Sequence, residues 1–76
     1  MPHVIVKLHT GRSKEQKRKA AEEIAKAVMT SLGASETSIS VSFEDVEPKD
    51  WTETVYRPDI QGKPDQLYKK PGYNPL

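Results

Sequence analysis

Hydrophobic and polar side chains alternate at the start of the chain. Over residues 2–9, one face of an extended backbone carries Val4, Val6 and Leu8, and the other face carries mainly polar or basic residues. A period of two is typical of a β-strand with one buried face. The pattern therefore predicts a first strand over residues 2–9.

A longer period follows the first strand. Ser13 and Gln16 have the spacing of a capping box, and Gly33 is a residue type favoured just beyond the end of a helix. Between them, six apolar residues recur every three or four positions and form one stripe: Ala21, Ile24, Ala25, Val28, Met29 and Leu32. This pattern predicts an amphipathic helix of about 19 residues, roughly 29 Å long.

Alternation returns after the helix. Over residues 38–46, Ile39, Val41 and Phe43 alternate with serine and acidic residues, which predicts a second strand. A strand, a long helix and a strand in this order predict an α/β fold, a β-α-β unit with parallel strands and a right-handed crossover. We assign this core to residues 2–46 of a single domain that spans residues 1–76.

The rest of the chain is rich in residues that interrupt regular structure. Residues 47–76 contain five of the six prolines and two of the four glycines. This density predicts turns, with one short helical turn after Pro48, and otherwise an irregular C-terminal tail.

The predicted core is too small to be stable alone. A chain of 76 residues buries only about 60% of the surface that its unfolded form exposes, and it has no cysteine to form disulfides. Two strands and one helix also leave two open sheet edges and one uncovered sheet face. We therefore expect a homo-oligomer, either a dimer with a four-stranded sheet and two helices or a trimer of dimers.

Charge and composition narrow the expected partners. The formal net charge is only +1, so charge predicts neither a nucleic acid nor a membrane as partner. The sequence has neither a membrane-spanning run nor a secretory signal, and we expect a cytoplasmic protein. His3 and His9 lie about 20 Å apart along the predicted strand, too far to bind one metal ion. We interpret both histidines as surface residues and expect no metal site.

Pro2 has the most distinctive potential chemistry. If Met1 is removed, Pro2 carries a free secondary amine, and α-amino groups titrate near about 7.7–8.0. Burial or a nearby cation lowers the pKa of such an amine toward neutrality, where it can act as a general base. If Met1 is retained, the nitrogen is an amide, and Pro2 is then only a residue that the start of a strand tolerates.

The order of the motifs resembles that of a known family. The dipeptide "MP" precedes the first strand, "GRSKEQK" opens the helix, and "TSISVSFEDV" leads to "DW". Over about residues 2–51, this combination resembles the 4-oxalocrotonate tautomerase family, and the tail "KKPGYNPL" is similar to a bacterial phenylpyruvate or para-substituted-cinnamate tautomerase subgroup. The resemblance implies an amino-terminal proline as catalytic base and keto–enol tautomerisation of a small molecule without a cofactor.

The resemblance also implies roles for individual residues. Pro2 matches the catalytic proline, Arg12 matches an arginine that binds a substrate carboxylate, and Trp51 takes the place of an aromatic wall of the pocket. Ser40 stands where the name-giving enzyme has a second arginine. A hydroxyl cannot offer the charged, bidentate contact of arginine, which favours a 2-oxo acid or enol with one carboxylate. Alternatives remain: a solvated loop charge for Arg12 and a core or interface anchor for Trp51.

Distance along the first strand constrains this site. Pro2 and His9 are about 23 Å apart at 3.3 Å per residue, and Arg12 lies farther along the chain. If Arg12 serves the Pro2 site, it must come from a neighbouring subunit whose strand runs antiparallel. Tyr56, Tyr68 and Tyr73 could each offer a phenolic proton, and the sequence does not choose among them. Two other interpretations stay open, a non-catalytic oligomeric binding module and a proline-dependent hydratase or dehalogenase.

Overall fold

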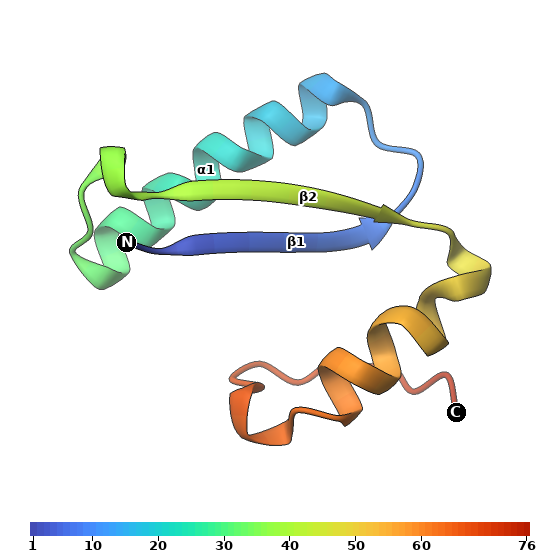
Figure 1. Cartoon of the computed structure of the whole chain (residues 1–76). Helices are drawn as coiled ribbons and strands as arrows, with labels where there is room; N and C mark the ends of the chain where they lie inside the picture. The colour runs from blue at the N-terminus through green and yellow to red at the C-terminus, as the bar shows by residue number, and fades with distance from the viewer.

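Two parallel strands joined by one long helix form the first two thirds of the protein. The computed structural model describes all residues from 1 to 76. Strand β1 (His3–His9) leads to helix α1 (Lys14–Leu32), and the chain returns in strand β2 (Ser40–Val46) (Figure 1). The strands pair in parallel, with His3 opposite Ser40 and His9 opposite Val46. The predicted β-α-β unit is confirmed.

Local signals in the sequence set both ends of α1. The Ser13 hydroxyl accepts a hydrogen bond from the Gln16 backbone N–H at 3.1 Å, and the Gln16 side chain accepts one from the Ser13 N–H at 2.9 Å. At the other end, Gly33 has a φ of 67°, a left-handed conformation that favours glycine. Its N–H donates to the Met29 carbonyl at 3.0 Å. The helix therefore begins and ends where the sequence predicts.

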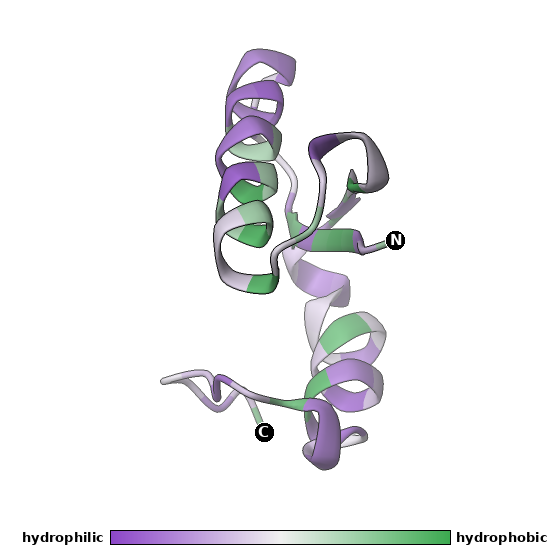
Figure 2. Cartoon of the chain, turned by 90° about the vertical axis from the view of Figure 1, so that its left-hand side faces the viewer, coloured by the Kyte–Doolittle hydropathy of each residue, from purple (hydrophilic) through white to green (hydrophobic).

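Helix α1 covers one face of the sheet. Figure 2 shows hydrophobic residues on the side of α1 that is turned toward the strands and hydrophilic residues on its outer side. Val6 and Leu8 of β1 and Phe43 of β2 meet Ala20 and Ile24 of the helix around a cavity of about 240 Å³. An ion pair of 2.7 Å between Lys17 and Asp45 joins the helix to β2.

The segment before β2 contains a short helical turn. The alternating pattern predicts a strand from residue 38, but β2 begins at Ser40 because η1 (Glu36–Ser38) is a 3-10 turn. The Ser38 hydroxyl donates to the Ser35 carbonyl at 2.7 Å, and this local hydrogen bond favours a turn over a strand.

The tail is not irregular throughout, which corrects the expectation for residues 47–76. A 3-10 turn, η2 (Pro48–Asp50), follows Pro48 as predicted, but a π-helix, η3 (Thr52–Gln61), comes next and includes Pro58. Proline lacks the N–H that continues an α-helix, and here the segment forms wider turns, such as Gly62 N–H to Arg57 carbonyl at 2.8 Å. After a last 3-10 turn, η4 (Pro64–Gln66), the chain is irregular.

Helix η3 lies on the side of the sheet opposite α1 (Figure 1). Its Val55 is buried, with 4% of its surface exposed. Asp59 accepts a hydrogen bond from Lys7 of β1 at 2.5 Å, and Lys63 lies 3.6 Å from the same carboxylate. The Lys7 hydrogen bond and charge hold the pKa of Asp59 below its usual value, while Asp59 raises the pKa of Lys7. An ion pair therefore attaches the tail to the open sheet face.

The single chain buries very little apolar surface. Val55 is the one residue of 76 that is buried. Ile5 on the open sheet face is 51% exposed, and Leu32 at the end of α1 is 71% exposed. Exposed apolar side chains of this kind leave the fold short of hydrophobic stabilisation. No helix of the chain is both long enough and apolar enough to cross a membrane.

We predict that Asp59→Asn lowers the free energy of unfolding at pH 7 and that this loss shrinks in acid. The pKa of Asp59 is lowered on folding, so its stabilising contribution is complete above about pH 4 and disappears as the pH falls through the lower, folded pKa. The raised pKa of Lys7 keeps the contribution intact below about pH 10 and removes it at higher pH.

Urea unfolding at pH 7 and pH 3, at one protein concentration, measures this difference. Asp65→Asn is the matched control, since Asp65 is an exposed aspartate in η4. The interpretation of Asp59 is contradicted if both variants lose the same stability at pH 7.

Candidate active site

Pro2 and Ser40 lie side by side at the amino-terminal end of the sheet. The Ser40 backbone N–H donates to the Pro2 carbonyl at 3.2 Å, which extends the parallel ladder by one bond. Met1 is fully exposed, so no packing holds it in place. Two residues with expected site roles are therefore neighbours within one chain.

His3 joins this pair through its imidazole ring. Its Nδ1 lies 2.6 Å from the Ser40 hydroxyl, and its Nε2 lies 3.4 Å from the Ser42 hydroxyl. Sequence reasoning treated His3 as a surface residue, and it is indeed exposed. The strand register, which aligns His3 with Ser40, is what brings it into the Pro2 cluster. The register of the two paired strands is the signal from which the contact of His3 with Ser40 could have been predicted.

Trp51 lies at the opposite end of the sheet. Its ring meets the ring of His9 edge-on at 4.9 Å, and its indole N–H donates to the Tyr73 hydroxyl at 2.8 Å. Tyr56 packs against Tyr73 at 5.6 Å. Of the three tyrosines that the sequence left open, Tyr73 is therefore the one bonded to an expected site residue. His9, Trp51 and Tyr73 line a cavity of about 450 Å³ together with Pro48, Thr52 and Pro75.

Arg12 is not close to Pro2. It follows β1 at the end opposite Pro2, it is exposed, and it borders the small cavity between α1 and the sheet. The length of β1 keeps the Arg12 and Trp51 end about 20 Å away from the Pro2 and Ser40 end. One chain thus holds two separate groups of expected site residues.

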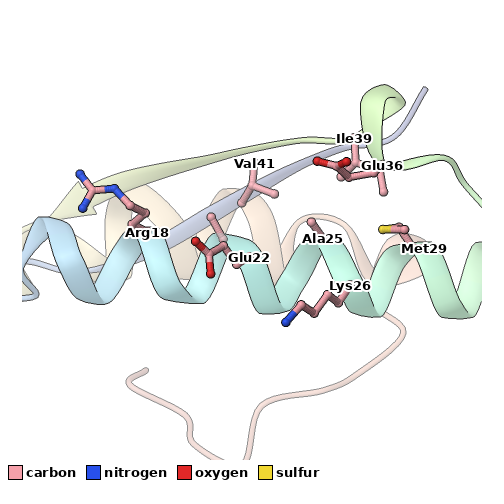
Figure 3. A pocket seen from close by; sticks show the side chains of 9 residues that line it. Arg18, Glu22, Ala25, Lys26, Met29, Glu36, Ile39 and Val41 are labelled. Atoms are coloured by element: carbon pink, nitrogen blue, oxygen red, sulfur yellow. The ribbon is translucent and has the colours of Figure 1, made fainter.

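The largest cavity lies away from both groups. It measures about 600 Å³ and lies between α1 and the segment from η1 into β2 (Figure 3). Ala25, Met29, Ile39 and Val41 form its apolar part, and charged residues such as Arg18 and Glu36 stand around it. No expected site residue lines it. The structure also contains no group of three or more His, Cys, Asp or Glu side chains that could hold a metal ion.

The sequence matches curated proteins over nearly its whole length. A family model described as tautomerase enzyme matches residues 2–54. A probable tautomerase from Xylella fastidiosa (strain 9a5c) is 43% identical, over 100% of this chain and 93% of the relative. Tautomerase PptA from Pectobacterium carotovorum subsp. carotovorum (strain PC1) is 42% identical, over 97% of this chain and 99% of the relative.

Solved structures share the fold. The crystal structure of YwhB, a homologue of 4-oxalocrotonate tautomerase, matches with a TM-score of 0.59 and 43% identity, over 60% of this chain and 75% of that chain. A 4-oxalocrotonate tautomerase isozyme from Methylibium petroleiphilum matches with a TM-score of 0.63 and 34% identity, over 66% of this chain and 81% of that chain.

We predict that Tyr73→Phe loosens Trp51 while the protein stays folded. The substitution keeps the ring but removes the acceptor of the indole N–H, which costs about 1 kcal/mol of stability. Trp51 is the sole tryptophan, so intrinsic fluorescence reports on it directly, and acrylamide quenching should increase. Tyr68→Phe is the matched control, because Tyr68 is 98% exposed. Equal quenching in the wild type and Tyr73→Phe would contradict the role of this hydrogen bond.

Proposed function

Because the chain belongs to the tautomerase family, and is therefore an isomerase of this type, we propose that it moves a proton in a keto–enol 2-oxo acid with Pro2 as general base. The observation that carries this proposal is the place of Pro2, at the start of β1 beside Ser40 and preceded by an exposed Met1. Removal of Met1 exposes the amine at the edge of the open sheet face.

The proposed reaction needs only a proton acceptor and groups that stabilise negative charge. In the keto-to-enol direction, the neutral amine of Pro2 takes a proton from the carbon next to the carbonyl. The electron pair of that C–H bond forms the carbon–carbon double bond, and the π pair of the carbonyl moves to the oxygen. The oxygen then takes the proton from the protonated Pro2, which returns the amine to its neutral form. A base with a pKa near neutrality suits this step in both directions. We propose that no cofactor takes part.

We propose substrate-binding roles for residues at both ends of the sheet. Ser40, next to Pro2, would donate a hydrogen bond to the substrate. Arg12 would bind the substrate carboxylate with its planar, charged guanidinium, and Trp51 would form an aromatic wall. Since Ser40 is uncharged, we propose that the enzyme prefers substrates with one carboxylate over dicarboxylates.

We propose a homo-oligomer that builds each site from two chains. The exposed Ile5 and Leu32 and the two-stranded sheet with open edges support association with another copy. A neighbour whose β1 runs antiparallel would bring its Arg12 and Trp51 end to the Pro2 end of the first chain. Both a dimer and a trimer of dimers satisfy this requirement.

The first test of this function is the state of the amino terminus. We predict that intact-mass measurement of the active enzyme finds a chain without Met1. We also predict that Pro2→Ala lowers kcat for ketonisation of the phenylpyruvate enol by at least about 100-fold, the usual contribution of a positioned general base. Pro64→Ala, in the exposed turn η4, is the matched control. An active chain that retains Met1, or a Pro2→Ala variant with unchanged kcat, would refute the mechanism.

A second test asks whether Arg12 acts between chains. Pro2→Ala and Arg12→Ala should each be nearly inactive, but co-expression should produce mixed oligomers with intact sites. In a randomly mixed dimer, half of the molecules are mixed and one of their two sites is complete, so about a quarter of the wild-type activity should return. Sedimentation at several concentrations checks the assembly. No recovery in verified mixed oligomers would place Arg12 outside the shared site.

A further inference from the structure

His3 spans two serine hydroxyls on the neighbouring strand. Its Nδ1 is 2.6 Å from the Ser40 oxygen, and its Nε2 is 3.4 Å from the Ser42 oxygen. Both ring nitrogens therefore have a hydroxyl partner, and the shorter contact is the one beside Pro2. The cluster consists of uncharged donors and acceptors whenever the imidazole is neutral.

The tautomer of His3 determines which hydroxyl proton in this cluster is free, since either tautomer satisfies both contacts. A neutral imidazole has one N–H and one bare nitrogen. With the proton on Nδ1, His3 donates to Ser40, and Ser42 donates to Nε2. The Ser40 oxygen then uses an acceptor position for His3, so its own hydroxyl proton remains available for another acceptor. Protonation of the ring leaves this arrangement at Ser40 unchanged, since Nδ1 still donates.

We propose that His3 is a positioning residue that aims the Ser40 hydroxyl proton at the 2-oxygen of the substrate. This inference rests on the proposed function, in which Pro2 removes a proton from the carbon adjacent to the 2-oxo carbonyl carbon. As the proton leaves, negative charge develops on the 2-oxygen, and a hydrogen bond already in place there stabilises the transition state more than the ground state. Arg12 of a neighbouring chain then holds the carboxylate.

The position of the cluster suits this role. Ser40 is bonded through its backbone to Pro2, at 3.2 Å, so its side chain starts one strand away from the proposed base. His3 and Ser40 are exposed on the face that α1 does not cover. A substrate can therefore reach the hydroxyl. The preferred substrate is then a 2-oxo acid that places its 2-oxygen between Pro2 and Ser40. A second carboxylate does not occupy this position.

Four variants test the proposal, assayed with the phenylpyruvate enol. His3→Leu and Ser40→Ala should each lower kcat by about 10- to 100-fold, with little change in KM, because the lost hydrogen bond strengthens only in the transition state. The double variant should be no slower than Ser40→Ala, since the two residues act as one unit. His3→Asn should recover most of kcat, because its amide N–H takes the place of Nδ1–H.

The controls separate this proposal from a structural role and from the proposed function itself. Ser31→Ala removes a hydroxyl that bonds the Ala27 carbonyl in α1 and should leave kcat unchanged. Additive losses in the double variant, a rise in KM alone, or no rescue by His3→Asn would overturn the role of His3. If Pro2→Ala abolishes activity while His3→Leu remains fully active, only the role of His3 fails. If Pro2→Ala is fully active, the proposed function fails.

Discussion

The parallel pairing of β1 with β2 is the constraint on which the rest of the structure depends. Because the two strands run in the same direction, their amino-terminal ends meet, and His3 lies opposite Ser40. Their carboxyl-terminal ends meet six residues later, where His9 faces Val46 and the chain continues into Trp51. A strand is nearly inextensible. The fold thus separates the Pro2 end from the Arg12 and Trp51 end within every copy.

The same two-stranded sheet explains why so little of the chain is buried. One helix covers one face, and the other face holds η3 mainly through Val55 and the ion pair of Lys7 with Asp59. A hydrogen-bonded ion pair contributes less than a filled apolar interface, because both charges give up part of their hydration. Ile5, on the same face, keeps half of its surface exposed. The proposed assembly of copies would cover the open sheet edges and bring together the two groups of expected site residues.

The sequence predicts those parts of the fold that depend on local chemistry. The Ser13 and Gln16 capping box and Gly33 define α1 because caps act over a few residues. The π-helix η3 was not predicted, because Pro58 is a helix breaker in an α-helix and its tolerance here depends on wider turns. Gly62 allows this turn, since a Cβ there would come within 2.8 Å of the Pro58 carbonyl oxygen.

The site shows the same division between local and long-range information. The resemblance to the family nominates Pro2, Arg12, Ser40 and Trp51. The length of the first strand is enough to separate Pro2 from Arg12 within one chain. The contact of His3 with Ser40 joins residues 37 positions apart, and that of Trp51 with Tyr73 joins residues 22 positions apart. The periodicity of hydrophobic residues does not predict contacts between residues so far apart in the sequence. They follow from strand register and from the path of the tail.

The proposed division of the site between chains has a consequence for the proposed base. Around Pro2, one chain supplies groups without a permanent charge, the Ser40 and Ser42 hydroxyls and the imidazole of His3. The permanent cation, Arg12, comes from another copy in the proposed assembly. A nearby cation disfavours the protonated form of an amine and so lowers its pKa. Association would therefore bring the carboxylate-binding Arg12 to the site and would also favour the neutral, basic form of Pro2. Substrate binding and the basicity of Pro2 would then both depend on formation of the oligomer.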